Sequence, residues 1–419
     1  MDKQLSFFPN NGMNYFKLRG KIKPISKSNR EIGGNYIGYP HTTPLPIAIK
    51  AYKNFIRYNS NLVGTSTRIE GNVTYTRKLE TDVIKMFGEL YGDDNVDGYV
   101  SSGGTEGNIF GTWLGCNYLK NMTNSEVGVI TSELVHQSID KAISLQNIKY
   151  YKKVPLTDSF QIDVNKLMNG IKEFIEQGII NIILVVTSGY TVTGTQDDLL
   201  LIEKKIDELK RKEKFNIYMH VDASIGGLIF PFIEQEHSRY LENKYVKSVT
   251  VDPHKMGYVP LTAGVFLCKK GLQNLLKVKI NYVEEKYDDT LTGSRNALSV
   301  VAIWAVINKL GFYGFQKAID NLLSMKKKIV RLFESNKYFY VFPQSKINMI
   351  CFTIRNGNFK LSKEIEKKYG LDLFSISYQN EKIECYKIYI MPHLTIKTIR
   401  RFLLDISFEI EISNRDEHK

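Results

Sequence analysis

Seven apolar, strand-like segments alternate with helical segments between residues 98 and 268, and this alternation constrains the fold more than any other feature of the sequence. It is typical of a largely parallel sheet with helices on both faces. The expected strands lie at 98–101, 127–131, 148–153, 180–187, 216–222, 246–251 and 262–268. The expected helices lie at 104–120, 136–146, 163–177 and 198–212. We therefore predict an α/β fold with a mostly parallel seven-stranded sheet flanked by helices.

The pattern differs on either side of this core. Residues 1–45 show no strong periodicity and are expected to form an irregular arm, after which Pro46 opens a helix. Beyond residue 296, two helical stretches and several shorter strands predict a separate α+β layer. We expect three units: an N-terminal arm and helix over 1–60, a large domain over 61–295 and a small C-terminal α+β domain over 296–419.

The composition is that of an ordinary globular protein, with 43% hydrophobic and 24% charged residues. No stretch approaches the roughly 18 uncharged apolar residues of a membrane helix, and the first residues do not resemble a signal peptide. The formal net charge is +13, but the lysines are spread over helix faces. A solvated basic surface explains this charge better than a nucleic-acid partner. We expect a cytoplasmic protein with no membrane and no nucleic-acid partner.

The four cysteines predict neither disulfides nor metal sites. They are widely spaced, form no CxxC motif and lie within apolar segments. We expect reduced thiols in the core, as is usual in the cytosol, and no metal ligands. The residues are Cys116, Cys268, Cys351 and Cys385.

Two polar residues follow apolar strands about thirty residues apart. Asp222 ends the strand 216–222, and Lys255 follows the strand 246–251 after a turn at Pro253. The carboxyl ends of parallel strands meet at one edge of a sheet, where open α/β folds bind ligands. A desolvated lysine is a usable amine nucleophile, and a carboxylate buried at a strand end needs a partner. The pair fits pyridoxal 5'-phosphate, because Lys255 can form a Schiff base with its aldehyde and Asp222 can keep its ring nitrogen protonated.

A glycine-rich segment between a strand and a helix supplies a candidate phosphate site. The segment Ser101–Asn108 contains Gly103, Gly104 and Thr105 at the start of the expected helix 104–120. Glycines let backbone N–H groups approach an anion, and a helix N-terminus adds a positive dipole end. An ordinary glycine-rich helix cap without a ligand explains the segment equally well.

Further candidates lie near other strand ends. His136 starts a helix, where a hydrogen-bonded structural role is the simpler interpretation and stacking on a cofactor ring is the alternative. Thr191 lies in a hydroxyl-rich loop and is a candidate cofactor contact, while Asp197 in the same loop is expected to cap the next helix. Ser294 lies in a loop that opens a helix and is a candidate phosphate or subunit contact.

Taken in order, these segments resemble the group II pyridoxal phosphate-dependent amino acid decarboxylases. The resemblance extends from about Gly38 to the C-terminal helix and is nearest to the branch of bacterial histidine decarboxylase and plant serine decarboxylase. The segments nearest to that branch are Gly38–Pro40, Gly98–Asn108, Gly293–Asn296 and Gly311–Lys317. The resemblance implies a fold type I subunit, like that of aspartate aminotransferase, and a homodimer with active sites at its interface.

The resemblance also implies roles for individual residues. Lys255 resembles the Schiff-base lysine, Asp222 the partner of the ring nitrogen and His136 the ring-stacking histidine. Ser224 is expected against the ring, where many relatives have alanine. The phosphate-side contacts that it implies are Gly104, Thr105 and His254.

Departures from that branch concern the substrate rather than the cofactor. Asp252–Lys255 replaces the usual Ser-Gly-His-Lys and is similar to archaeal tyrosine/aspartate decarboxylases. Tyr190 replaces a common threonine. Val221–Ala223 and Gly226–Gly227 are also similar to sphingosine-phosphate lyase, a carbon–carbon lyase with the same cofactor.

We therefore predict decarboxylation of an L-amino acid to an amine and CO2, with a histidine-, serine- or aromatic-type substrate. Tyr282, or Tyr287 in the same polar segment, is the candidate acid that protonates Cα. The alternative is a carbon–carbon lyase of the sphingosine-phosphate lyase type, which would need a second phosphate pocket.

Overall fold

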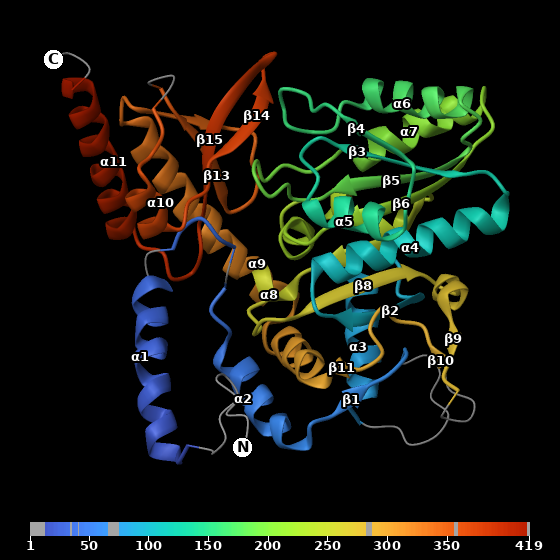
Figure 1. The fold of residues 1–419 in the computed structure, drawn as a ribbon, viewed down its shortest axis with the longest axis horizontal. Coiled ribbons are helices and arrows are strands. Elements are labelled where there is room, and N and C mark those ends of the chain that lie inside the picture. The colour runs from blue at the N-terminus through green and yellow to red at the C-terminus, as the bar shows by residue number, and fades with distance from the viewer. Residues whose placement is uncertain are drawn as a thin grey trace, which may run out of the picture.

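The computed structural model describes residues 13–33, 36–40, 42–65, 75–281, 287–355 and 359–416. A seven-stranded sheet forms its centre, in the order β2–β8–β7–β6–β5–β3–β4 (Figure 1). β8 runs antiparallel to β2 and β7, and the other adjacent strands are parallel. The strands are β2 Val96–Ser101, β3 Val127–Ser132, β4 Tyr150–Val154, β5 Asn181–Thr187, β6 Asn216–Asp222, β7 Val246–Val251 and β8 Gly264–Lys269. The predicted α/β class is confirmed, and each expected strand is present.

The side chains of β5 explain why helices cover both faces of this sheet. Ile182 and Leu184 belong to an apolar cluster with α6 and α7. Ile183 and Val185, which point the other way, belong to a second cluster with α4 and α5. A continuous apolar strand is expected where both faces are buried. The helices around the sheet are α3 Tyr75–Leu90, α4 Gly104–Met122, α5 Gln137–Leu145, α6 Val164–Glu176 and α7 Leu199–Lys210.

Helix α4 lies close against β6 and β7 because its sheet-facing positions are glycines. A Cβ added at Gly107 would lie 2.4 Å from Thr250 Oγ1. A Cβ added at Gly111, one turn further on, would lie 2.5 Å from the ring of His220. Both distances are shorter than any ordinary contact, so a larger residue would push the helix outward. The close approach brings the polar side chains of α4 within reach of β6.

The C-terminal part forms a second layer, joined to the first by the long helix α9 Ala297–Glu334. A kink at Gly311, with φ of 59°, divides α9 into the two helical stretches that the sequence predicts. Val300 packs in the main cluster and Phe333 in a cluster under the second sheet, so α9 serves both layers. The predicted boundary near residue 295 stays a prediction. The second sheet has the order β12–β13–β15–β14, and its elements are β12 Phe339–Phe342, β13 Met349–Ile354, α10 Lys363–Tyr369, β14 Phe374–Tyr378, β15 Glu381–Tyr389 and α11 Ile396–Asp416.

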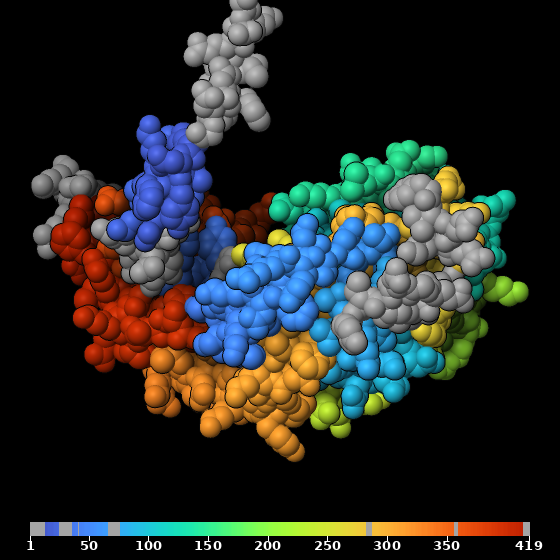
Figure 2. Space-filling model, turned by 90° about the horizontal axis from the view of Figure 1, so that it is seen from below, coloured from blue at the N-terminus to red at the C-terminus, as the bar shows by residue number. Residues whose placement is uncertain are grey.

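The N-terminal region differs from its prediction. Instead of an irregular arm, Tyr15–Gly33 forms helix α1, which projects from the body of the molecule (Figure 2). Its residues 15–24 are exposed, so this part of the helix shows no buried apolar stripe that a sequence pattern would reveal. The predicted second helix is present as α2 Pro46–Phe55. Two short ladders, β1 Asn61–Leu62 with β11 Arg295–Asn296 and β9 Val278–Lys279 with β10 Tyr287–Asp288, complete the strands.

Three other predictions concern burial. The four cysteines are free and buried, as expected. Among the described residues, α9 is the one helix long and apolar enough to cross a membrane. Its inward side chains, however, pack in the two apolar clusters of the protein core. Lys326 of α9 is not part of a solvated basic face: its Nζ donates to the carbonyl oxygens of Ser345 at 2.6 Å and Ile347 at 2.7 Å. Burial lowers its pKa to about 8.

Candidate active site

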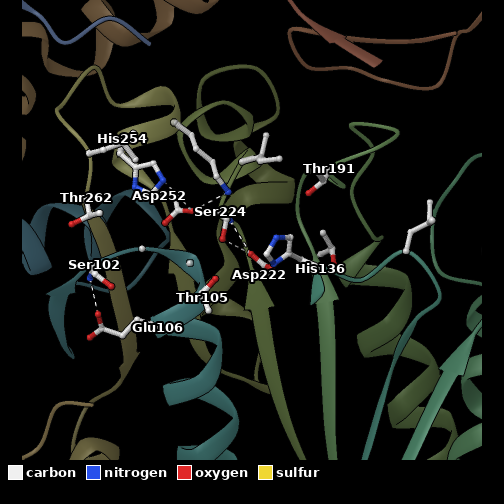
Figure 3. A pocket seen from close by; sticks show the side chains of 18 residues that line it. Ser102, Thr105, Glu106, His136, Thr191, Asp222, Ser224, Asp252, His254 and Thr262 are labelled. Carbon is white, nitrogen blue, oxygen red and sulfur yellow. Dashed lines mark hydrogen bonds and ion pairs between the residues drawn. The ribbon is translucent and has the colours of Figure 1, made fainter. Parts of the chain in front are cut away.

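A cavity of about 340 Å³ lies at the carboxyl edge of the main sheet, where the ends of β2, β3, β5, β6 and β7 meet (Figure 3). Its lining comes from separate loops that only the fold brings together. The predicted site residues in the lining are Gly103, Gly104, Thr105, His136, Thr191, Asp222, Ser224, His254 and Lys255. The cavity therefore collects nearly all the residues that the sequence singled out.

Lys255 lies on α8 Pro253–Met256, a one-turn helix that follows β7. Its Nζ forms an ion pair with Asp252 Oδ2 at 2.9 Å. The other oxygen, Asp252 Oδ1, is buried without a hydrogen-bond partner in the described part of the chain. The Nδ1 atom of His254 lies 2.7 Å from the Ala263 carbonyl oxygen, so this nitrogen donates and the ring is fixed beside the cavity. An amine and an imidazole thus reach the cavity from adjacent positions.

Asp222 is the last residue of β6 and is only 4% exposed. Its Oδ2 accepts a hydrogen bond from Asn108 Nδ2 at 2.7 Å. Its Oδ1 accepts two from Ser224, one from the backbone N–H at 3.1 Å and one from the hydroxyl at 2.6 Å. Burial alone would raise the pKa of this carboxyl, but the Ser224 hydrogen bond and the charge of Lys255 outweigh it and lower the pKa. The cavity thus contains an ionised carboxylate.

The glycine-rich segment forms an open cradle at the start of α4. Gly103 has φ of 155° and ψ of −178°, a backbone conformation that is essentially restricted to glycine. A Cβ added at Gly104 would lie 2.3 Å from Ser224 Oγ, so only glycine fits between the start of α4 and Ser224. The N-terminus of α4, with its positive dipole end, faces the cavity, whose lining includes Gly103, Gly104 and Thr105. This arrangement suits a phosphate.

His136 is the N-cap of α5 and faces the cavity from the end of β3. Its Nδ1 accepts a hydrogen bond from the Ser138 backbone N–H at 3.2 Å and lies 2.8 Å from the Ser138 hydroxyl. Burial lowers the pKa of His136, so the ring is neutral and carries its proton on Nε2. On another wall of the cavity, the Thr191 carbonyl oxygen accepts a hydrogen bond from Tyr389 of β15 at 3.0 Å. Figure 3 shows His136 beside Asp222.

Two predicted site residues do not belong to this cavity as described. Ser294 is not part of the lining; its hydroxyl accepts a hydrogen bond from Asn61 Nδ2 at 2.9 Å. Its contact with a cofactor, made across a subunit interface, stays a prediction. Tyr282 lies outside the described residues. Tyr287, the other candidate acid, lies in β10 with its ring 3.4 Å from Lys277 Nζ and is not part of the lining.

The expected cap of α7 was assigned to the wrong aspartate. Asp198 is the N-cap, and its carboxylate accepts a hydrogen bond from the Leu201 N–H at 3.0 Å. The preceding Asp197 points inward and accepts hydrogen bonds from the Thr187 N–H at 2.8 Å and the Tyr190 hydroxyl. Burial raises its pKa to about 6. Asp197 thus supports the loop behind the cavity rather than the helix.

Four residues that hold the site were missed at the sequence level. They are Asn108, Ser138, His220 and Asp252. The period of a strand could have found His220, because it lies two residues before Asp222 and therefore on the same face of β6. The position of Asp252, three residues before Lys255, is also a signal once a helical turn is expected there. Asn108 gives no such signal, since its role depends on how α4 lies on the sheet.

The cavity offers what pyridoxal 5'-phosphate requires: an amine, an ionised carboxylate and an open helix N-terminus for a phosphate. The unpartnered Asp252 Oδ1 is a further sign that a polar group belongs there. With the sheet topology, these features define a pyridoxal phosphate-dependent enzyme of fold type I. Residues 114–355 match the family model of the pyridoxal-dependent decarboxylase conserved domain. The chain belongs to this family and is a pyridoxal phosphate-dependent amino acid decarboxylase.

Two relatives cover most of the chain. A probable L-tyrosine/L-aspartate decarboxylase of Methanosphaera stadtmanae is 28% identical over 90% of this chain and 92% of its own length. A tryptophan decarboxylase of Clostridium sporogenes is 31% identical over 84% of each chain. These relatives support the family without selecting the branch that the sequence motifs favoured.

Solved structures show the same fold. L-Methionine decarboxylase from Streptomyces sp. 590 superimposes with a TM-score of 0.82 at 16% identity and covers 96% of each chain. The sphingosine-1-phosphate lyase of Burkholderia pseudomallei superimposes with a TM-score of 0.80 at 17% identity, covering 97% of this chain and 93% of its own. At such identities the likeness concerns the fold alone.

Proposed function

We propose that this enzyme removes the α-carboxylate of an L-amino acid in the cavity at the carboxyl edge of the main sheet, and that Lys255 and Asp222 are its central residues. The observation that supports this most is the convergence of the Lys255 amine and the ionised Asp222 carboxylate on one cavity, beside the glycine cradle. Neither residue has another apparent task for its position.

Pyridoxal phosphate, when bound, supplies an aldehyde that condenses with amines and a ring that accepts the electron pair left as CO2 departs. In our proposal, Lys255 is the residue that would hold the cofactor through this aldehyde. Asp252, paired with Lys255 Nζ, is placed to hold or return a proton at that nitrogen. The N-terminus of α4, with Thr105 and His254, holds the phosphate.

Asp222 acts on the ring nitrogen. Its three hydrogen-bond donors keep the carboxylate ionised, so it can accept an N–H from a protonated ring nitrogen. That contact keeps the ring positively charged and increases its capacity to accept electrons. Ser224 contributes twice, through its backbone and its hydroxyl, which gives a reason for serine at a position where alanine is common among relatives.

His136 presents a neutral ring to the cavity, with its proton on Nε2. We propose that this ring packs against the cofactor and donates its Nε2 proton to the substrate carboxylate, which orients the bond to be broken. The acid that protonates Cα is proposed to be Tyr282. The choice rests on its place in the polar segment before the second layer.

The names of the relatives support an order in which to test substrates. Their names include L-tyrosine, L-aspartate and tryptophan, so aromatic L-amino acids are the first to test, followed by histidine and serine. We further propose a cytoplasmic homodimer, in which Ser294 of one subunit reaches the cofactor of the other. Its place on an exposed loop leaves it accessible to a second copy.

A carbon–carbon lyase acting on a phosphorylated amino alcohol is the alternative. The lyase of Burkholderia pseudomallei shares the fold, but such a substrate needs a second phosphate site beside the cofactor phosphate. Phosphoethanolamine release from a phosphorylated amino alcohol, without CO2 release from any amino acid, would favour this alternative.

The proposal is tested by loading the protein with pyridoxal phosphate, reducing with borohydride and mapping the modified peptide. The modification should lie on Lys255. CO2 release from candidate L-amino acids should fall on the order of 10³-fold or more in Lys255→Ala, since an essential covalent group is removed. Lys346→Ala is the matched control, because Lys346 is exposed and pairs with Glu234 outside the cavity. Modification at another lysine, or none, would refute the proposal.

A further inference from the structure

We propose that Asn108 is a positioning residue that fixes Asp222 and His136 at the same time, and that a neutral His220 fixes Asn108 in turn. This inference deepens the proposed function and rests on it, because Asp222 and His136 are the two side chains assigned to the cofactor ring. The residues that it adds, Asn108, Ser138 and His220, lie beneath the cavity and are not part of its lining.

Asn108 lies on α4, is 1% exposed and uses every polar atom of its amide. Its Nδ2 donates to Asp222 Oδ2 at 2.7 Å and to Ser138 Oγ at 2.8 Å. Its Oδ1 lies 2.9 Å from His220 Nε2. The three partners come from β6 and α5, two elements far apart in sequence. Asn108 is therefore the junction of a buried polar network.

The direction of each hydrogen bond in this network is determined. An ionised carboxylate only accepts, so the amide must turn its NH2 group to Asp222 and its oxygen to His220. His220 must then carry its proton on Nε2, which leaves Nδ1 to accept from Ser248 Oγ at 2.7 Å. Ser248 in turn accepts from the Tyr218 hydroxyl at 2.7 Å. The chain runs in one direction, from Tyr218 through His220 to the carboxylate.

The network needs His220 to stay neutral, and its surroundings ensure this. The ring is fully buried between α4 and β7, in the space left by Gly111. Burial lowers the pKa of His220 to about 4, although the nearby Asp222 charge acts in the opposite direction. A protonated ring would donate from both nitrogens, so Ser248 could no longer donate to Nδ1 and this hydrogen bond would have to reverse.

The second N–H of Asn108 starts another branch. It occupies the Ser138 hydroxyl oxygen, so the hydroxyl proton is left to point to His136 Nδ1, 2.8 Å away. This reinforces the tautomer of His136 that the Ser138 backbone N–H also favours, with the proton on Nε2 toward the cavity. One amide thus determines the charge environment of the ring nitrogen and the donor presented by His136.

A matched residue separates positioning from plain stability. Asn181 is also fully buried and makes four hydrogen bonds, but it lies at the opposite edge of the sheet. Loss of either amide should destabilise the protein. Only loss of the Asn108 amide should change the cofactor site.

The experiment uses wild type, Asn108→Ala, Asn108→Asp, Ser138→Ala and Asn181→Ala, each titrated with pyridoxal phosphate labelled with ¹⁵N in the ring. The ¹⁵N chemical shift reports whether the ring nitrogen is protonated, and the titration gives the Kd. We expect a protonated nitrogen in wild type, Ser138→Ala and Asn181→Ala. Both Asn108 variants should lose part of that signal and bind the cofactor roughly 10- to 100-fold more weakly, as expected for loss of a hydrogen bond to a charged group.

Ser138→Ala cuts only the branch to His136, so it should raise the KM for the amino acid while the ring-nitrogen signal stays as in wild type. If both Asn108 variants keep the wild-type shift and Kd, the inference is overturned while the proposed function stands. Asn108→Asp has the size of the native residue and keeps this test available if Asn108→Ala does not fold. A wild-type protein that binds no pyridoxal phosphate would overturn both.

Discussion

The two edges of the central sheet differ in whether particular buried polar atoms have hydrogen-bond partners. At the amino edge, the amide of Asn181 is fully used in hydrogen bonds to Thr123, Ser125 and Asn216. At the carboxyl edge, Asp252 Oδ1 and Thr250 Oγ1 are buried without a partner among the described residues. Unpaired buried groups destabilise a fold unless something else pairs them. The amide of Asn181 is thus paired within the protein, whereas Asp252 Oδ1 is left for a group that the cavity binds.

The largest expected effect comes from removing a charge at the carboxyl edge. Asp222→Asn should lower the rate of CO2 release on the order of 10³-fold, because the ring nitrogen loses its anionic partner. The melting temperature of this variant should also fall, because the new amide NH2 would face one of the buried donors that bind Asp222. Asp97→Asn is the matched control: Asp97 is a buried strand aspartate near the amino edge, bound by Lys270 and the Gly271 N–H. An equal loss of activity in both variants would contradict the comparison.

A pH effect on stability should be the next largest. The folded-state pKa of His220 is about 4, below its ordinary 6.5, because the ring is buried. The unfolded chain therefore binds a proton that the folded chain does not, so this contribution is complete above pH 6.5 and is lost as pH falls toward 4. The full difference corresponds to about 3 kcal/mol.

Urea unfolding of the cofactor-free protein between pH 4 and 7 measures this contribution. The variant His220→Gln provides the reference. The raised pKa of Asp197 changes stability in the opposite direction over this pH range, but Asp197 is present in both proteins. Its contribution therefore cancels when the two pH profiles are subtracted. If the two proteins show parallel pH profiles, His220 is not held neutral as the geometry requires.

At the amino edge, Asn181→Ala should cost about 2 kcal/mol of unfolding free energy, because it leaves several buried groups unpaired. The kcat of the loaded enzyme should stay as in wild type. Thermal denaturation and CO2 release, measured on the same preparation, check the two parts. A tenfold loss of kcat would show that the two edges are coupled.

The smallest effect is expected for a surface pair near the amino edge. Lys149 and Glu126 form an ion pair at 3.3 Å, with exposed fractions of 67% and 56%. Lys149→Ala should change the free energy of unfolding by about 0.5 kcal/mol or less, and less still at high salt. A larger loss would mean that exposed polar contacts also matter at this edge.

Local patterns account for the parts of the molecule that sequence reasoning predicted. The apolar runs of β5, β6 and β7 identify buried parallel strands, and the ends of β6 and β7 place Asp222 and Lys255 at one edge. Helix α1 and strand β14 were missed. The apolar residues of α1 from Tyr15 to Ile22 are exposed, and β14 has a short, mixed pattern of buried and exposed residues. Neither carries the periodicity on which such predictions depend.

The sequence by itself determined the central sheet, the edge of that sheet at which the cofactor binds, and the class of cofactor. It could do so because strand periodicity and the residues that end a strand are local properties. Only the tertiary structure decided which side chains complete the site. The pairing of Asn108 with Asp222 and His220 depends on how closely α4 lies on β6. That distance is set by packing between segments more than a hundred residues apart, and no local pattern records it.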